Sequence, residues 1–251
     1  MTTDLRIVSD PAELARAAAA EFARHASAAV RERNLFSVAL SGGSTPKLLY
    51  AELANDPSLR DRLSWDKIHF FWGDERAVPP DDEESNFRLA HDALLSQVPV
   101  PPENVHRIRA EETDPALAAS DYERELRNFF QLNSQQLPRF DLILLGLGPD
   151  GHTASLFPST DALNETEHLV VANWIERLKT HRITVTFPVL NNAASVLFLV
   201  SGSEKANVLR DVISGANTDE YPAQRVRPTS GTVTWLVDED AASQISRAAD
   251  K

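Results

Sequence analysis

The sequence predicts an α/β protein with a mainly parallel sheet that is flanked by helices on both faces, in a single domain over residues 1–251. Apolar runs of strand length alternate with segments of helical periodicity, a pattern typical of a buried parallel sheet. The chain has 251 residues, of which 42% are hydrophobic, enough for one large core or two small ones. No linker or low-complexity block divides it, so one domain is expected.

The first helix is expected over residues 10–34, after a strand at 5–9. Asp10 is a favourable N-cap, Pro11 suits the first helical position, and Glu13 would complete a capping box. One helical face then carries an apolar stripe. Its members are Leu14, Ala18, Phe22, Ala26 and Val30.

The later elements repeat this order of apolar run, turn and helical segment. Strands are expected at 36–43, 67–75, 140–148, 181–188, 195–202 and 232–238. Helices are expected from Thr45 onward and over 85–95, 203–213 and 239–249. Open parallel sheets bind ligands beyond the carboxyl ends of their strands. The residues that follow each strand are therefore the candidates for chemistry.

Composition narrows the class of partner. The net charge of −12 disfavours nucleic acid or an anionic membrane as the partner. The absence of cysteine excludes disulfides, thiolate metal sites and a cysteine nucleophile, and it suits the cytoplasm. No signal peptide or membrane span is expected, and no regular spacing of histidines and carboxylates suggests a metal site.

The stretch "SGGSTPK" (41–47) joins a strand to a helix through small residues. Gly42 and Gly43 allow a tight turn, and the Ser44 and Thr45 hydroxyls add donors at a helix N-terminus. Such a turn is a cradle for phosphate or carboxylate. It is neither a P-loop nor a dinucleotide fingerprint. An ordinary capped strand–helix turn explains the motif equally well.

Two further strand ends carry cations. In "WGDERAV" (72–78), Asp74 and Arg76 could bind a polar ligand, although a surface ion pair is the commoner fate of such neighbours. In "SGSEKA" (201–206), Ser203 as cap would place Lys205 in the first helical turn, where a cation opposes the helix dipole. An anion site would use that lysine; an unoptimised surface lysine is the alternative.

The stretch "GLGPDGHTASLFP" (146–158) ends a buried strand in glycines and a titratable imidazole. His152 is a candidate general base, since histidine ordinarily titrates near pH ~6.5. Asp150 could orient its ring. A histidine that merely caps or packs at a helix start is the alternative. No G-x-S-x-G elbow occurs, which disfavours a serine nucleophile.

Six motifs stand in order between about residues 36 and 245. They are "LSGGSTPKLLY", "FFWGDERAVPPDDEESNFRLAHDALL", "FDLILLGLGPDGHTASLFP", "RITVTFPVLNNA", "VLFLVSGSEKA" and "GTVTWLVDEDAA". Together they resemble the 6-phosphogluconolactonases. This resemblance implies a Rossmann-like fold and hydrolysis of 6-phospho-D-glucono-1,5-lactone to 6-phospho-D-gluconate in the oxidative pentose phosphate pathway, without metal or organic cofactor.

The resemblance also implies roles for individual residues, with His152 as the base that activates water for attack on the C1 carbonyl. Together with the residues considered above, the catalytic candidates are His152, Asp74 and Asp150. The substrate- and phosphate-binding candidates are Gly42, Gly43, Ser44, Thr45, Arg76, Arg182 and Lys205. Arg76, a backbone N–H or Thr153 could stabilise the oxyanion, and the sequence leaves all three open.

Two other functions share this fold. The aminosugar-phosphate deaminases have motifs similar to D-E-Y and D-G-H-I-A-F-N-E-P at the positions where this chain has "GDERAV" and "DGHTASLFP". The acidic residue that follows the histidine in the deaminases is therefore missing here. A non-catalytic sugar-phosphate sensor would need a DNA-binding segment or a basic patch. The leading hypothesis is therefore a lactonase that acts on a small sugar phosphate, binds no nucleic acid or membrane, and is a monomer or weak homodimer.

Overall fold

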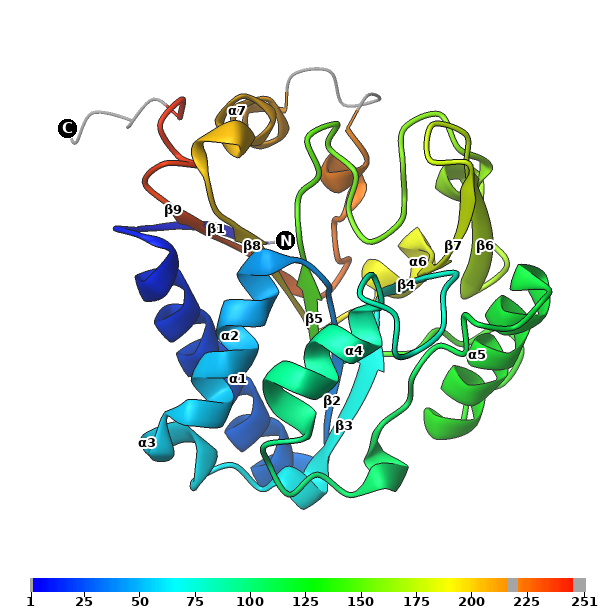
Figure 1. Cartoon of the computed structure of the whole chain (residues 1–251), viewed down its shortest axis with the longest axis horizontal. Helices are drawn as coiled ribbons and strands as arrows, with labels where there is room; N and C mark the ends of the chain where they lie inside the picture. Colours follow the sequence, from blue (N-terminus) through cyan, green and yellow to red (C-terminus); the bar gives the residue numbers. More distant parts are fainter. Residues whose placement is uncertain (1, 216–220, 246–251) are drawn as a thin grey trace.

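The computed structural model describes residues 2–215 and 221–245, and its main feature is a parallel sheet of six strands in the order β1-β9-β8-β5-β2-β3 (Figure 1). Every strand pair in it is parallel, as predicted. The strands are β1 (Thr2–Val8), β2 (Phe36–Leu40), β3 (Ile68–Trp72), β5 (Leu142–Leu145), β8 (Ser195–Val200) and β9 (Thr232–Asp238). Every residue of β2, β5 and β8 is buried, which explains their unbroken apolar sequences.

A second, antiparallel sheet of three strands has the order β4-β7-β6. Its strands are β4 (Asp74–Arg76), β6 (Val170–Ile175) and β7 (Thr180–Val185). The strand predicted at 181–188 corresponds to β7, whereas β6 was not predicted. The strand predicted at 67–75 is wrong as one element, because the chain changes sheets at Gly73. The Gly73 N–H donates to Leu40 of β2, while its carbonyl accepts from Val185 of β7.

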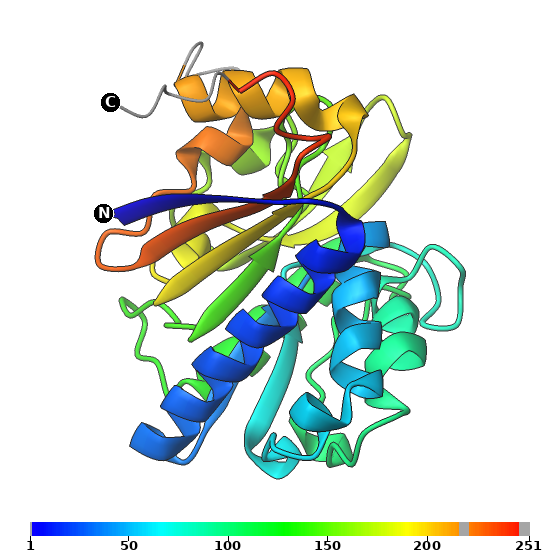
Figure 2. The same ribbon diagram turned by 90° about the vertical axis from the view of Figure 1, so that its left-hand side faces the viewer.

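Helices cover both faces of the parallel sheet. They are α1 (Pro11–Arg33), α2 (Ser44–Asn55), α3 (Pro57–Arg60), α4 (Asn86–Ala90), α5 (Pro115–Phe129), α6 (Phe187–Leu190) and α7 (Ala206–Ser214). Figure 2 shows α1 and α2 packed together across one face, and the small sheet with α5 lies on the other side in Figure 1. The β3 residue Phe70 stacks on Phe22 of α1, whereas its neighbour Phe71 contacts Phe129 of α5.

The predicted helix boundaries hold in part. Asp10 accepts the backbone N–H of Glu13 at 2.8 Å, but the Glu13 carboxylate pairs with Arg16 in place of closing a capping box. The helix predicted at 85–95 begins after Ser85 as α4 and continues as a π-helical turn at His91–Leu95.

The two C-terminal helix predictions need correction. Residues 203–205 form a 3₁₀ turn, so Lys205 is the N-cap residue of α7 and does not lie in its first turn. Turns replace the helix predicted from 239 to 245, and residues 246–249 lie outside the described residues. The buried Asp238 carboxylate accepts backbone N–H groups from Gly202 and Ala241 and so ties these two segments together. None of the described helices is long and apolar enough to cross a membrane.

Candidate active site

A pocket of about 340 Å³ lies beyond the carboxyl ends of the parallel strands. Seven residues predicted for the site line it: Gly42, Gly43, Asp74, Arg76, His152, Arg182 and Lys205. Asp150 is absent from this lining and instead contacts His152 from an adjoining pocket. Ser44 and Thr45 lie in the first turn of α2, next to the lining residue Gly43. The structure thus brings together side chains from both sheets.

The loop that carries His152 depends on two glycines. The Gly148 N–H donates to the His152 carbonyl at 2.8 Å, and the Gly151 N–H donates to the Gly148 carbonyl at 3.0 Å. A Cβ on Gly148 would lie 2.0 Å from the His152 Nδ1 atom. Gly151 has φ +74°, and a Cβ there would lie 2.3 Å from the Tyr221 ring. Glycine is therefore required for the imidazole to lie directly against the backbone of its own loop.

His152 and Asp150 form a hydrogen-bonded pair. Asp150 Oδ1 lies 2.5 Å from His152 Nδ1, and the His152 ring stacks on Phe157 with centroids 3.9 Å apart. Although partial burial opposes ionisation, hydrogen bonds from His152 and the Arg177 charge lower the pKa of Asp150 to about 2. An ionised Asp150 accepts the proton on Nδ1, which leaves Nε2 as the basic nitrogen of a neutral imidazole. The pair is thus arranged for general base chemistry.

Asp74 is buried and is held by Ser155 and Asn86, two residues that the sequence motifs did not single out. Its Oδ2 accepts the Ser155 hydroxyl at 2.6 Å, and the Asn86 amide donates to the Asp74 carbonyl at 2.9 Å. The Asn86 Oδ1 atom is buried and accepts no hydrogen bond from the part of the chain that the structure describes. A Cβ on Gly42 would lie 1.8 Å from that atom. Gly42 is therefore needed because Asn86 approaches it closely, and Asn86 offers an unused acceptor at the pocket.

Two arginines face each other across the β4–β7 pair. Arg76 and Arg182 are direct partners in the antiparallel register. The Arg76 guanidinium donates to the Glu84 carbonyl, whereas Nε and Nη1 of Arg182 are buried and have no acceptor among the described residues. Burial, and then the Arg76 charge, lower the pKa of Arg182. Directly opposed like charges destabilise a sheet, so this pair favours an anionic ligand that accepts the free N–H groups.

Glu75, which lies between two site residues in sequence, has a structural role. Its buried carboxylate accepts the backbone N–H groups of Asn86 and Phe87, each at 2.8 Å, and the Ser85 hydroxyl at 3.1 Å. It therefore caps the first turn of α4. Burial raises the pKa of Glu75 despite these hydrogen bonds.

Two buried tyrosines hold the strand ends from which the pocket is built. The Tyr50 hydroxyl accepts the Ser41 N–H at 3.1 Å and donates to the Ser41 carbonyl at 2.7 Å. The Tyr122 hydroxyl makes the same pair of bonds with Trp72, at 2.8 and 3.0 Å. Each hydroxyl thus satisfies one donor and one acceptor of a backbone that is turning out of the sheet.

Tyr50→Phe is expected to lower the free energy of unfolding by about 1–3 kcal/mol, because two buried backbone groups of Ser41 lose their partner. Urea unfolding followed by tryptophan fluorescence measures this change. Tyr122→Phe, which removes the corresponding pair of bonds to Trp72, should cost a similar amount. An unchanged urea midpoint would show that the Tyr50 hydroxyl does not stabilise the turn.

The fold and the site define an α/β protein with a histidine–carboxylate pair and a pocket lined by arginine and lysine side chains at the carboxyl edge of a parallel sheet. The chain belongs to the family described as glucosamine-6-phosphate isomerases/6-phosphogluconolactonase, whose model matches residues 9–235. It is 44% identical to the 6-phosphogluconolactonase of Synechocystis sp. over 218 residues, which cover 86% of this chain and 88% of that protein.

Solved structures agree with this assignment. The 6-phosphogluconolactonase from Trypanosoma cruzi superposes with a TM-score of 0.86 at 30% identity, over 98% of each chain. The Thermotoga maritima 6-phosphogluconolactonase gives 0.80 at 33% identity, over 94% of this chain and 100% of that one. A monomeric glucosamine-6-phosphate deaminase gives 0.77 at 22% identity, over 97% of this chain and all of that one, which shows a shared fold only.

Proposed function

We propose that this protein hydrolyses 6-phospho-D-glucono-1,5-lactone to 6-phospho-D-gluconate, the reaction of the oxidative pentose phosphate pathway for which its relatives are named. The observation that carries the proposal is that Arg182, with its unused guanidinium donors, lines the same pocket as His152, whose ring is hydrogen-bonded to Asp150. An anionic sugar held by the cations would be presented to a base. Lys205 lines the same pocket together with Arg76, Arg177 and Arg182.

In the proposed mechanism, Nε2 of His152 takes a proton from water as the water oxygen attacks the C1 carbonyl. The resulting tetrahedral intermediate collapses with cleavage of the bond between C1 and the ring oxygen. The imidazolium returns the proton to that oxygen, which becomes the free hydroxyl, and the new carboxylic acid loses its proton to solvent. Asp150 stabilises the imidazolium while it exists. No metal or organic cofactor takes part.

One of the three candidate donors to the oxyanion, Thr153, is disfavoured by its hydrogen bonding. Thr153 is buried, and its hydroxyl donates to the Gly146 carbonyl at 2.9 Å. Because that proton already has an acceptor, we assign the oxyanion contact to Arg76 or to a backbone N–H. The phosphate then belongs to Arg182 and Lys205, and it supplies the binding energy that orients the lactone ring.

The test generates the lactone in situ with glucose-6-phosphate dehydrogenase and follows proton release. We expect wild-type protein to accelerate release above the spontaneous rate, in proportion to enzyme concentration. No acceleration would contradict the proposal. Ammonia release from glucosamine 6-phosphate would then test the deaminase alternative, and binding without turnover would indicate a sensor.

Location and assembly remain predictions. The curated relatives include bacterial proteins and chloroplastic plant proteins, so family membership does not decide between compartments. The cytoplasmic location is predicted from the absence of cysteine, and the lack of a nucleic-acid partner from the negative net charge. The monomeric or weakly dimeric state stays a prediction.

A further inference from the structure

We propose that Arg177 is a positioning residue for the catalytic pair: it holds Asp150 and, through Asp150, the imidazole of His152. This inference rests on the proposed function, because it assigns His152 as the base. Arg177 lies in the hairpin that joins β6 to β7, and none of the sequence motifs singled it out.

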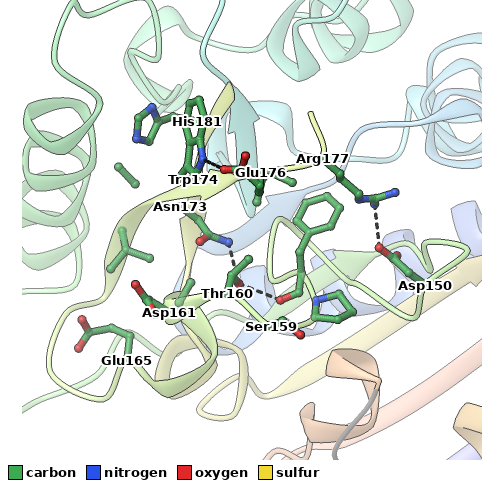
Figure 3. A pocket seen from close by; sticks show the side chains of 16 residues that line it. Asp150, Ser159, Thr160, Asp161, Glu165, Asn173, Trp174, Glu176, Arg177 and His181 are labelled. Carbon is green, nitrogen blue, oxygen red and sulfur yellow. Dashed lines mark hydrogen bonds and ion pairs between the residues drawn. The ribbon is translucent and has the colours of Figure 1, made fainter. Parts of the chain in front are cut away.

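The hairpin brings Arg177 to Asp150 from a distant part of the chain. The Leu178 N–H donates to the Ile175 carbonyl at 3.0 Å and closes the turn. From this turn Arg177 reaches Asp150 Oδ2 through Nη2 at 2.7 Å (Figure 3). The two residues form one wall of the adjoining pocket of about 750 Å³, and Arg177 also lines the pocket that holds His152. The second sheet is thus connected directly to the catalytic loop.

Arg177 contacts both groups that fix the imidazole. Asp150 uses Oδ1 for His152 and Oδ2 for Arg177, so each carboxylate oxygen has its own partner and the plane of the carboxylate is set. The Arg177 guanidinium carbon also lies 5.0 Å from the centre of the Phe157 ring, on which His152 stacks. Loss of Arg177 would leave Oδ2 of Asp150 without a partner and Phe157 without its cation, so the plane of the carboxylate would be less firmly fixed although its Oδ1 bond to His152 remains.

The ion pair between Arg177 and Asp150 contributes little to the stability of the fold. The Arg177 side chain is 51% exposed, and exposed ion pairs contribute little to folding. Its consequence lies in the site, where the guanidinium offsets the charge that Asp150 presents to His152. Without it, the carboxylate stabilises the imidazolium more strongly, so the neutral base forms only at higher pH. The other charged groups of the pocket are Asp74, Arg76, Arg182 and Lys205, and they remain unchanged.

The test compares Arg177→Gln with Lys179→Gln, which removes one positive charge from an exposed position of the same hairpin. For Arg177→Gln we expect kcat to fall roughly 10- to 100-fold, KM to change little, and the acid limb of the kcat/KM profile to move to higher pH. The melting temperature should stay within a degree or two of wild type. Lys179→Gln should match wild type throughout.

Arg177→Lys should restore the acid limb, because it keeps the charge, but only part of kcat, because an ammonium lacks the planar fork. If Arg177→Gln matched Lys179→Gln, or raised KM alone, Arg177 would not position the base.

A second readout separates this inference from the proposed function. The imidazole ¹⁵N signals of His152 report its titration whether or not the protein hydrolyses the lactone. A titration midpoint that moves upward in Arg177→Gln and not in Lys179→Gln supports the inference even if lactone turnover is absent. An unmoved midpoint overturns it even if the wild type is an active lactonase.

Discussion

His152→Gln is expected to slow lactone hydrolysis by roughly 10²- to 10⁴-fold, the usual contribution of a general base. Glutamine keeps much of the volume of the side chain that stacks on Phe157 but has no basic nitrogen for the water proton. The lactone formed in situ, with proton release measured against the spontaneous rate, gives the size of the loss. Binding of 6-phosphogluconate should persist, because the cations of the pocket are untouched.

His168→Gln is the matched control, since His168 is an exposed histidine outside the pocket whose ring pairs with Glu165. It should hydrolyse the lactone at the wild-type rate. A wild-type rate in His152→Gln would mean that another group is the base, with Asp74 the next candidate. Loss of product binding together with the rate would show that His152 shapes the pocket as well as supplying the base.

Arg182→Met is expected to weaken 6-phosphogluconate binding by roughly 10- to 100-fold while it raises the melting temperature. The loss follows from removing charged donors that have no partner within the described residues, since hydrogen bonds to charged groups contribute about 1.5–3 kcal/mol. The gain follows because burial and Arg76 both disfavour the Arg182 charge in the unliganded protein. A gain of about 1 kcal/mol corresponds to roughly 2–4 °C.

Isothermal titration with 6-phosphogluconate and thermal unfolding without ligand measure the two effects. Arg31→Met, at an exposed position on α1, is the control and should change neither quantity. Arg182→Lys should recover part of the binding, since it restores a charge without the fork. A lower melting temperature with unchanged affinity would assign Arg182 to the fold and not to the substrate.

The position of the site could be predicted from sequence because it follows from a general property of parallel sheets. Apolar runs identify the strands, and the polar residues after them must meet at one edge. The glycines around His152 could likewise be recognised as turn residues, but the sequence did not show why glycine is needed at these positions. Gly148 is needed because the imidazole lies against it, and Gly42 because Asn86 does.

The element boundaries failed where a distant group decides the local conformation. Asp238, at the end of β9, accepts the backbone N–H of Gly202 and so holds the turn that follows β8. Gly73 passes the chain from one sheet to the other, which divides an apolar run that looks continuous. Periodicity and capping rules consider residues that are close in sequence, so they cannot predict hydrogen bonds between segments that are far apart in the chain.

The sequence by itself predicted the fold class, the edge of the sheet at which the candidate pocket lies, and seven of the residues that line it, His152 among them. Only the tertiary structure decided which groups act on one another: Arg182 opposite Arg76, Arg177 on Asp150, and Asn86 against Gly42. The physical reason is one of range. Backbone preferences and apolar periodicity are local and can be recognised along the chain, whereas charges and hydrogen bonds between distant segments depend on the topology that places them within a few ångströms.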